Sequence, residues 1–441
     1  MFFTFFFLLC SVVHANNPFF PIEKLYVQPS LSSNIQKTIS TISNNPQLVE
    51  NLKKIESRPS AYWIDKKEKI WSNVQTIMNN AEKVVFIIYD LPNRDCKALA
   101  SNGEICCNSD SNCDSFCSIP CQYESNSCEV GLYDYKTSYI DELYALFSQE
   151  KYKSKEIILV IEPDSIPNCI TNLGQNGCSE LTCQTYFDGI DYALKKFSTL
   201  PNIVMYLDAA HGGWLGWNNI LQQFQALISK QQWTKFIRGF AINVSNYQDL
   251  GNSACPYNIS SPITSDSYYN FMEILKKKNT TDSCGYDPCD FGSQYNAANN
   301  ELNYAQLLSW IFQNDKFDSE DQKPHIIIDT GRNGNPESRI GSESCKVWCN
   351  VYEAKIGKFP TTYTDIPSLI DAYFWLKTPG ESDGCINHEQ QEKCKVNDKN
   401  ICIRYDPNCG THPENIGYQT YQPCPPEAGQ WFDYQIKMLC S

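Results

Sequence analysis

The sequence is short of positive charge and of long apolar segments, and both shortages narrow what the protein can do. Its 441 residues contain 36 Lys and Arg against 50 Asp and Glu, so the formal net charge is −14. An acidic surface is unfavourable for binding nucleic acid or an anionic membrane, which attract basic proteins. Beyond the N-terminus, no segment is apolar over the roughly 20 residues that a transmembrane helix needs. We therefore expect a soluble protein with a neutral ligand and with neither a nucleic-acid nor a membrane partner.

Tandem repeats, Ser/Thr/Pro-rich linkers and a separate small module are also missing from the sequence. Their absence argues against a repetitive wall protein and against several domains. The chain contains 26 Tyr, 22 Phe and 9 Trp, and 42% of its residues are apolar, which is typical of a globular protein. Because α/β barrels reach about 250 residues or more, we expect one large domain over residues 16–441.

Residues 1–15 have the pattern of a signal peptide, a short apolar run that ends in Val13-His14-Ala15. Cleavage after Ala15 predicts a secreted, extracellular protein. The 22 cysteines agree with this location, because disulfide bonds persist in oxidising compartments. Removal of Cys10 leaves an odd number of cysteines, so at least one thiol is free or pairs with another chain. Sequons that can carry glycans on a secreted protein begin at Asn243, Asn258 and Asn279.

Apolar, β-branched runs predict strands that are buried on both faces of a parallel sheet. They span residues 84–90, 157–164, 203–208, 239–243, 325–329 and 372–377. Helical spacing over 139–152 and 181–200 alternates with them, which favours an α/β barrel or a doubly wound sheet. Asp164, Asp208 and Asp329 end three of the runs, at the edge where barrels carry their catalytic groups. Aspartate also starts turns, so it is the three together that favour a barrel with an acidic cleft.

Two cysteine-rich, polar segments interrupt this alternation, at residues 106–128 and 384–427. Long loops inside a compact domain are usually functional or disordered. Zinc is an alternative for the first segment, in which Cys113 and Cys117 are four residues apart, but disulfide bonds are more common in a secreted chain. We expect disulfide bonds to hold both segments, and we expect neither a metal nor a cofactor.

The segment from Asp208 to Trp217 combines an acid, a histidine, two tryptophans and several glycines. Glycoside hydrolysis needs a carboxylic acid to protonate the leaving oxygen. Aromatic rings can lie against the apolar faces of a sugar while polar groups bind its hydroxyls. A pair of core tryptophans near a turn is the alternative, but small residues beside polar groups favour a site that a sugar can approach closely.

Four stretches resemble glycoside hydrolase family 6, which contains cellobiohydrolase II and endoglucanases. They are residues 89–104, 160–165, 208–217 and 377–384, and residues 238–247 and 348–350 also fit. The similarity extends from about Asn17 to the C-terminus. It implies an α/β fold, a distorted (β/α) barrel with fewer than eight strands in a single catalytic domain. It also implies that a monomer hydrolyses β-1,4-glucan, as in cellulose and cello-oligosaccharides, with inversion at the anomeric carbon.

The resemblance assigns roles to individual residues. Asp164 matches the catalytic acid, and Asp95 matches the aspartate that keeps this acid protonated. Asp383 matches the aspartate proposed as base, a role that is disputed because water can be activated through further waters near Ser101. Tyr89 matches the tyrosine that presses on the distorted sugar.

Further positions match sugar-binding residues and disulfide bonds of the family. The sugar-binding positions are Asp208, His211, Trp214, Trp217, Asn246, Trp348, Lys377 and Glu381. The resemblance implies the bonds Cys96–Cys178 and Cys349–Cys409. Exo-acting members carry a tryptophan early in the domain, and its position here is matched to Leu25, which puts that sugar site in doubt.

The long 384–427 segment favours an exo-acting cellobiohydrolase that releases cellobiose, because this loop closes the tunnel in the family and is shortened in endoglucanases. An endoglucanase with an open groove is the alternative within the same fold. A non-catalytic glucan-binding protein would be expected to lack Asp164 or Asp95, and both are present.

Overall fold

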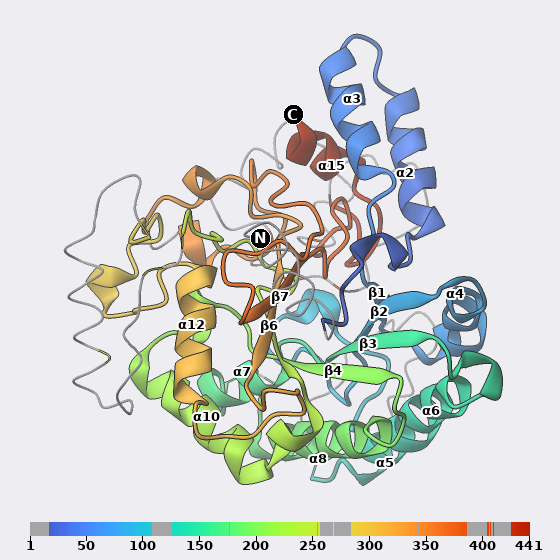
Figure 1. Ribbon diagram of the computed structural model, residues 1–441, viewed down its shortest axis with the longest axis vertical. Helices are drawn as coiled ribbons and strands as arrows, with labels where there is room; N and C mark the ends of the chain where they lie inside the picture. The colour runs from blue at the N-terminus through green and yellow to red at the C-terminus, as the bar shows by residue number, and fades with distance from the viewer. Residues whose placement is uncertain are drawn as a thin grey trace, which may run out of the picture.

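The computed structural model describes residues 17–107, 126–175, 177–253, 255, 268, 284–341, 344–385, 404, 406, 409 and 425–441. Seven strands form one sheet in which each strand pairs in parallel with the next (Figure 1). They are β1 (Tyr62–Ile64), β2 (Lys83–Ile88), β3 (Glu156–Ile161), β4 (Ile203–Asp208), β5 (Gly239–Ile242), β6 (His325–Asp329) and β7 (Ile370–Phe374). Within the described residues no strand pairing joins β7 to β1. The sheet is a curled, open barrel, so the predicted distorted barrel with fewer than eight strands is confirmed.

Both faces of the sheet are buried. In β2, the side chains of Val84, Phe86 and Ile88 belong to the apolar cluster between the sheet and the surrounding helices. Val85 and Ile87 belong to a second cluster, which fills the inside of the barrel. Successive side chains of a strand alternate between faces, so a strand with few polar residues has to be covered twice. The inside of the barrel is thus a packed core, which leaves the ends of the strands for a site.

Helices connect most of the strands and cover the outside of the sheet (Figure 1). They include α4 (Gln75–Asn80), α5 (Glu129–Asp134), α6 (Asp141–Phe147), α7 (Ser165–Thr171), α8 (Glu180–Phe197), α9 (Gly212–Leu215), α10 (Asn218–Gln231) and α12 (Glu301–Ile311). The predicted helices at 139–152 and 181–200 correspond to α6 with its flanking turns and to α8. Helix α8 begins after Ser179, whose hydroxyl accepts a hydrogen bond from the Thr182 amide at 3.1 Å.

Two strands differ from the sequence prediction. β1 was not predicted, because three residues between turns give too short an apolar run. β7 begins at Ile370, two residues earlier than predicted, because Asp371 interrupts its pattern. The Asp371 carboxylate is buried and pairs with the Arg238 guanidinium at 2.7 and 3.0 Å. A buried acid is tolerated there because it is paired, so its polarity does not mark the surface.

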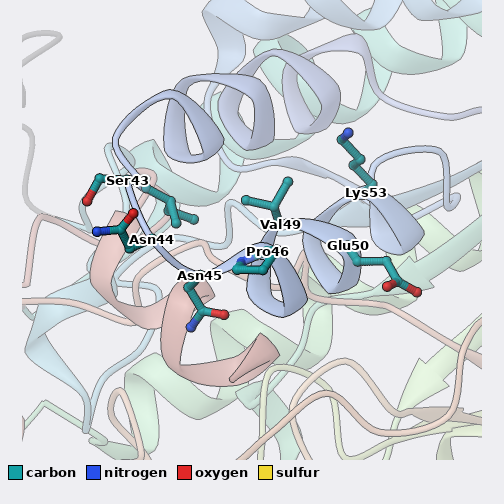
Figure 2. A pocket seen from close by; sticks show the side chains of 8 residues that line it. Ser43, Asn44, Asn45, Pro46, Val49, Glu50 and Lys53 are labelled. Carbon is teal, nitrogen blue, oxygen red and sulfur yellow. The ribbon is translucent and has the colours of Figure 1, made fainter.

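The two ends of the described chain pack together beside the barrel. Helices α2 (Pro29–Ser40) and α3 (Pro46–Ile55) form a hairpin next to the C-terminal α15 (Asp433–Cys440), as the top of Figure 1 shows. Figure 2 shows the turn of this hairpin, where Asn45 precedes Pro46. The Asn45 side chain caps α3 by accepting a hydrogen bond from the Leu48 amide at 3.0 Å.

The cysteines form the bonds expected of a secreted chain. The structure contains the bonds Cys96–Cys178, Cys107–Cys128, Cys169–Cys183, Cys255–Cys284, Cys289–Cys345 and Cys349–Cys409. Both implied pairs are therefore present, and Cys440 is a buried free thiol. In the described part of the chain, no helix combines the length and the apolarity needed to cross a membrane.

One of the three sequons, at Asn243, is not accessible for glycosylation in the folded protein. The Asn243 side chain is fully buried and donates to the Asp329 carbonyl at 2.9 Å. Asn258 and Asn279, like Cys113 and Cys117, lie outside the described residues.

Candidate active site

A cleft with a volume of about 990 Å³ lies at the carboxyl ends of the strands. Tyr89 follows β2, Asp164 follows β3, His211 follows β4, Asn246 follows β5 and Lys377 follows β7. Because the strands are parallel, the segments that follow them meet at one rim of the barrel. The predicted residues that line the cleft are Tyr89, Asp95, Ser101, Asp164, His211, Trp214, Trp217, Asn246, Trp348, Lys377, Glu381 and Asp383.

Asp164 has the surroundings of a proton donor. Its backbone has φ of +65°, a left-handed conformation that is strained for a residue with a Cβ atom, and its amide is fixed by the Asp208 carboxylate at 3.0 Å. Its own carboxyl group makes no hydrogen bond to the described part of the chain. Burial raises the pKa of Asp164 well above its usual range, and the negative charges of nearby aspartates, chiefly Asp95, raise it further. Asp164 is therefore an acid that keeps its proton at a pH where most aspartates are ionised.

Asp95 has a similar position but different neighbours. One oxygen of its carboxylate accepts hydrogen bonds from the Tyr89 hydroxyl at 2.8 Å and from the Ser101 hydroxyl. The Arg94 guanidinium lies 4.2 Å from the centre of the Tyr89 ring and adds positive charge. Burial raises the Asp95 pKa, while these two hydrogen bonds and Arg94 oppose the rise. Of the two acids, Asp95 is thus the one whose surroundings stabilise the ionised form, and Asp164 holds the proton.

Asp208 and Asp329 end β4 and β6 as predicted, but neither of them lines the cleft. Both are buried beneath the wall of the cleft, with 1% and 2% of their surface exposed. Asp208 accepts hydrogen bonds from the amides of Asp164 and Ala210 at 3.0 and 3.1 Å. Asp329 accepts three backbone hydrogen bonds, all at 2.9 Å, from Gly331, Ser245 and Lys377. They fix the backbone of the rim and leave the sugar to other residues, so the prediction of Asp208 as a sugar ligand is corrected.

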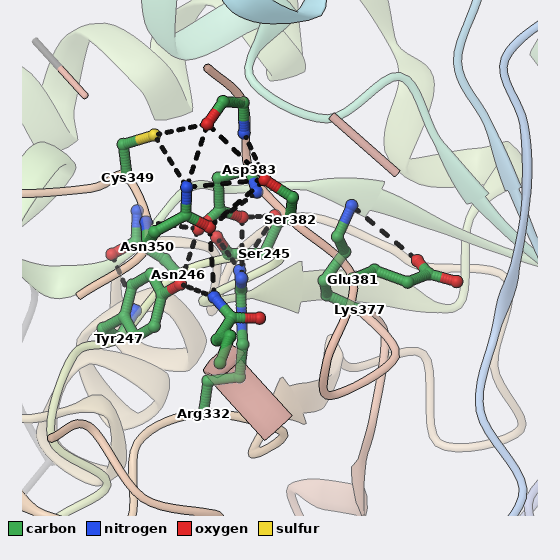
Figure 3. Close-up of polar contacts among 12 residues, drawn as sticks. Ser245, Asn246, Tyr247, Arg332, Cys349, Asn350, Lys377, Glu381, Ser382 and Asp383 are labelled. Carbon is green, nitrogen blue, oxygen red and sulfur yellow. Dashed lines mark hydrogen bonds and ion pairs between the residues drawn. The ribbon is translucent and has the colours of Figure 1, made fainter. Parts of the chain in front are cut away.

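Asp383 lines the cleft, but its carboxylate is occupied. Figure 3 shows Arg332, Tyr247 and Asn350 converging on it. The Arg332 guanidinium is 2.7 Å from one oxygen, and the Asn350 amide and the Tyr247 hydroxyl donate to the other. A general base needs a lone pair that is free for the incoming proton. The geometry instead makes Asp383 an anchor between the β5, β6 and β7 loops, which disfavours its predicted role as base.

Trp63, at one arm of the cleft, was missed by the sequence prediction. Its indole N–H donates to the Leu376 carbonyl at 2.8 Å, its ring meets Tyr89 edge-on with centroids 5.0 Å apart, and the Lys377 ammonium lies 5.2 Å from its centre. Leu25, to which the family's early tryptophan was matched, is 3% exposed and packs inside the barrel. Leu25 does not line the cleft and offers no aromatic face to a sugar there. The usable signal was that Tyr62-Trp63-Ile64-Asp65 repeats the pattern of an apolar run ending in Asp.

A pair of opposite charges lies beside Trp63. The Lys377 ammonium is 3.8 Å from the Glu381 carboxylate, as Figure 3 also shows. Burial raises the Glu381 pKa, and the positive charges of Lys377 and Lys69 oppose the rise. Ammonium and carboxylate groups can bind several sugar hydroxyls.

The other arm of the cleft carries a second set of aromatic rings. The Trp214 indole donates to the Thr171 hydroxyl at 2.7 Å, and the Trp217 indole donates to the Gln294 carbonyl at 3.0 Å. His211 lies beside Trp214, with ring centres 6.0 Å apart. Burial lowers the His211 pKa to about 3, so the imidazole is neutral and can both donate and accept.

Comparison with known proteins decides what this site belongs to. The model of the family described as glycosyl hydrolases family 6 matches residues 20–115 and 121–441. The chain belongs to this family. It is 30% identical to 1,4-beta-D-glucan cellobiohydrolase C of Emericella nidulans over 445 residues, 96% of this chain and 78% of that protein. The catalytic core of the cellobiohydrolase Cel6A from Chaetomium thermophilum has a TM-score of 0.68 at 29% identity, with 96% and 98% of the two chains covered.

A solved complex from the same family holds sugars. Cellobiohydrolase II of Humicola insolens, in complex with glucose and cellotetraose, has a TM-score of 0.68 at 25% identity, with 94% of this chain and 96% of that chain covered. Family membership makes this chain a glycoside hydrolase.

Proposed function

We propose that this glycoside hydrolase cleaves the β-1,4-glucosidic bonds of cellulose and cello-oligosaccharides and releases cellobiose from chain ends. The observation that carries the proposal is the arrangement of the two acids. No group in the described part of the chain donates a hydrogen bond to the Asp164 carboxyl group, whereas two hydroxyls donate to Asp95. One group supplies a proton and the other stays charged beside it, which is the division of labour that glycoside hydrolysis requires.

In the proposed reaction, Asp164 donates its proton to the glycosidic oxygen as the bond to the anomeric carbon breaks. The positive charge that develops on the sugar ring is stabilised by ionised Asp95. A water molecule attacks the anomeric carbon from the opposite face and gives up a proton, which inverts the configuration. Because Asp383 is held by Arg332, we propose that the proton leaves through water near Ser101, whose hydroxyl contacts Asp95.

The aromatic residues of the two arms are the proposed platforms for the glucan. Trp63 lies at one arm, Trp214 and Trp217 at the other, and Trp348 also lines the cleft. Indole rings offer broad apolar faces to glucose, and their N–H groups are already bonded to the protein for Trp63, Trp214 and Trp217. Lys377, Glu381, His211 and Asn246 are the proposed hydroxyl-binding groups.

Release from chain ends is proposed because two segments meet over the Asp95 side of the cleft. Most of the 384–427 segment lies outside the described residues. Its described members contact the loop after Asp95: the Arg404 guanidinium donates to the Asn102 carbonyl at 2.5 Å, and the Asp406 carboxylate accepts from the Leu99 amide at 3.0 Å. A covered site threads a chain end, whereas an open groove admits internal bonds.

We also propose that the protein is secreted after removal of residues 1–15 and acts as a monomer. The disulfide bonds support secretion, since they form in oxidising compartments. One chain supplies all the residues of the proposed machinery, so the proposed reaction needs no second copy.

The anomeric configuration of the fresh product tests the proposed reaction. Hydrolysis of cellotetraose, followed by proton NMR within the first minutes, is expected to show the α-anomer before mutarotation. An initial excess of β-anomer would mean retention, and the water-attack proposal would then be abandoned.

A further inference from the structure

A loop from elsewhere in the chain constrains Trp217, which lines the cleft. Trp217 precedes α10, whereas Phe291 and Gln294 belong to the loop before α12. The Phe291 ring meets the Trp217 ring at 68° with centroids 5.9 Å apart. The Gln294 carbonyl accepts the Trp217 indole N–H at 3.0 Å. These two contacts fix the ring and the nitrogen of the Trp217 indole. Phe291 and Gln294 also line the cleft.

The Phe291 ring can take this position only because Gly213 has no side chain. A Cβ atom at Gly213 would lie 2.4 Å from the Phe291 Cζ atom. Gly213 stands in α9, directly before Trp214. The glycine of one segment thus makes room for the aromatic ring of another.

The loop that carries Phe291 is itself braced at two points. The Asp287 carboxylate accepts the amides of Phe291 and Gly292 at 3.0 and 2.7 Å. The Cys289–Cys345 disulfide ties the loop to the segment that leads to Trp348. Phe291 and the two cysteines form one apolar cluster, against which Trp217 packs. A rigid support of this kind is what a precisely placed binding group requires.

We propose that Phe291 is a positioning residue for glucan binding, which holds the Trp217 ring in the orientation that accepts a glucosyl unit, and that the Cys289–Cys345 bond keeps Phe291 in place. This inference rests on the proposed role of Trp217 as a sugar platform. Without Phe291, the indole keeps its hydrogen bond to Gln294 but gains rotational freedom. Freezing that freedom on binding then costs affinity for substrates that reach Trp217.

The test measures kcat and KM for cello-oligosaccharides from cellotriose to cellohexaose. Trp217→Ala first defines which lengths reach the ring, since those substrates lose affinity and shorter ones do not. Phe291→Ala is expected to raise KM about 3-fold to 10-fold for the same lengths, the range of an edge-to-face aromatic pair. Its kcat, and its KM for the shorter substrates, are expected to stay unchanged.

A double variant shows whether Phe291 acts through Trp217. If it does, adding Phe291→Ala to Trp217→Ala leaves KM where Trp217→Ala alone put it. The matched control is Phe187→Ala, which removes the partner of Trp233 in another aromatic pair, with centroids 6.4 Å apart and outside the residues that line the cleft. This control is expected to change stability without any dependence on substrate length.

The outcomes separate the inference from the proposed function beneath it. A Trp217→Ala enzyme with unchanged KM at every length would remove the sugar platform itself. A normal Trp217 effect with no effect of Phe291→Ala, or with additive effects in the double variant, would overturn the positioning role. If Phe291→Ala does not fold, the Cys289→Ser, Cys345→Ser variant takes its place, with the same length-dependent rise of KM expected and the same results contradicting it.

Discussion

Asp95 and Asp164 carry the same carboxyl group, and their hydrogen bonds decide which of them keeps a proton. Asp95 is buried, Asp164 is half-buried, and both have left-handed backbones, with φ of +59° and +65°. Donors from Tyr89 and Ser101 can bond only to a lone pair, so they favour ionised Asp95. Burial raises the pKa of Asp164, and the negative charges of Asp95, Asp208 and Asp383 raise it further. Two strained backbones at adjacent strand ends are a common mark of a site under functional constraint.

Asp164→Asn is expected to lower kcat on unactivated cello-oligosaccharides by roughly 10²-fold to 10⁴-fold, the usual contribution of general acid catalysis. The amide keeps the shape of the side chain but cannot protonate the leaving oxygen. Binding of cellotetraose by isothermal titration calorimetry is expected to stay within a few-fold of the parent.

Asp208→Asn serves as the comparison for Asp164→Asn, since it alters a buried acid that contacts the Asp164 amide and does not line the cleft. It is expected to cost less activity. Near-normal turnover by Asp164→Asn would show that another group is the acid.

The sequence could predict which residues lie near the cleft. It could not predict roles that depend on which hydrogen bonds a side chain makes. Asp95, Asp164 and Trp214 stand in distinctive segments at strand ends, and the structure places all three at the cleft. Asp208 and Asp383 stand in equally distinctive segments, but two backbone amides donate to one oxygen of Asp208, which is buried, and Arg332 pairs with Asp383. The sequence does not show which neighbour occupies a lone pair.

At the level of elements, the parallel strands were predictable because each of the longer ones is apolar on both faces. β1 was missed because three residues give no period, and with it Trp63 was missed. The start of β7 was predicted two residues too late, because Asp371 is polar in the sequence but is buried in the structure, where it pairs with Arg238. The loops between strands could be assigned to the cleft only by resemblance, because their contacts join residues far apart in the chain.

The Cys96–Cys178 bond holds the loop of Asp95 against the segment before α8, and the two cysteines are 82 residues apart. Replacing both with Ser is expected to lower the free energy of unfolding by about 2–4 kcal/mol. The loss is expected to exceed that from replacing Cys169 and Cys183, which are 14 residues apart, because a longer closed loop removes more entropy from the unfolded chain. Chemical denaturation measures both losses.

The two disulfide variants are also expected to differ in activity. Loosening Asp95 is expected to lower kcat, since Asp95 directly precedes Cys96. Equal losses of stability and of kcat in the two pairs would contradict a specific role for the Cys96–Cys178 bond.

Across the whole molecule, buried carboxyl groups tie stability to pH. Burial raises the pKa of Glu162 and Asp208 to about 7, of Glu301 to about 8 and of Asp329 to about 6. In the unfolded chain such groups titrate near pH 4. Between these values the folded state binds more protons than the unfolded state, so the stabilisation is complete below about pH 4 and is lost as pH rises through 6 to 8. His211, with its pKa lowered to about 3, acts in the opposite direction but is a single group.

We therefore expect the melting temperature to fall as the pH is raised from 5 to 8 at constant ionic strength. Glu301→Gln keeps an oxygen for the Gly212 amide, which donates to the carboxylate at 2.9 Å, and is expected to flatten the fall above pH 6. Glu150→Gln, at an exposed position, is the control and is expected to leave the dependence of the melting temperature on pH unchanged. A melting temperature that rises over this range would contradict the proposal that these carboxyl groups are protonated in the folded state.

Whether the molecule acts on chain ends depends on how the loops of its rim meet. Arg404 and Asp406 join the 384–427 segment to the loop after Asp95, and Cys349–Cys409 ties the same segment beside Trp348. A rim held at both sides excludes bulky substituents and admits a threaded end. On carboxymethyl-substituted glucan we expect slow loss of viscosity for each reducing end released, and on cellulose we expect cellobiose as the main product. Exchanging Arg404 for Ala removes the donor to the Asn102 carbonyl and is expected to shift the enzyme toward faster viscosity loss. A parent enzyme that lowers viscosity rapidly while few ends appear would identify an open groove and an endoglucanase.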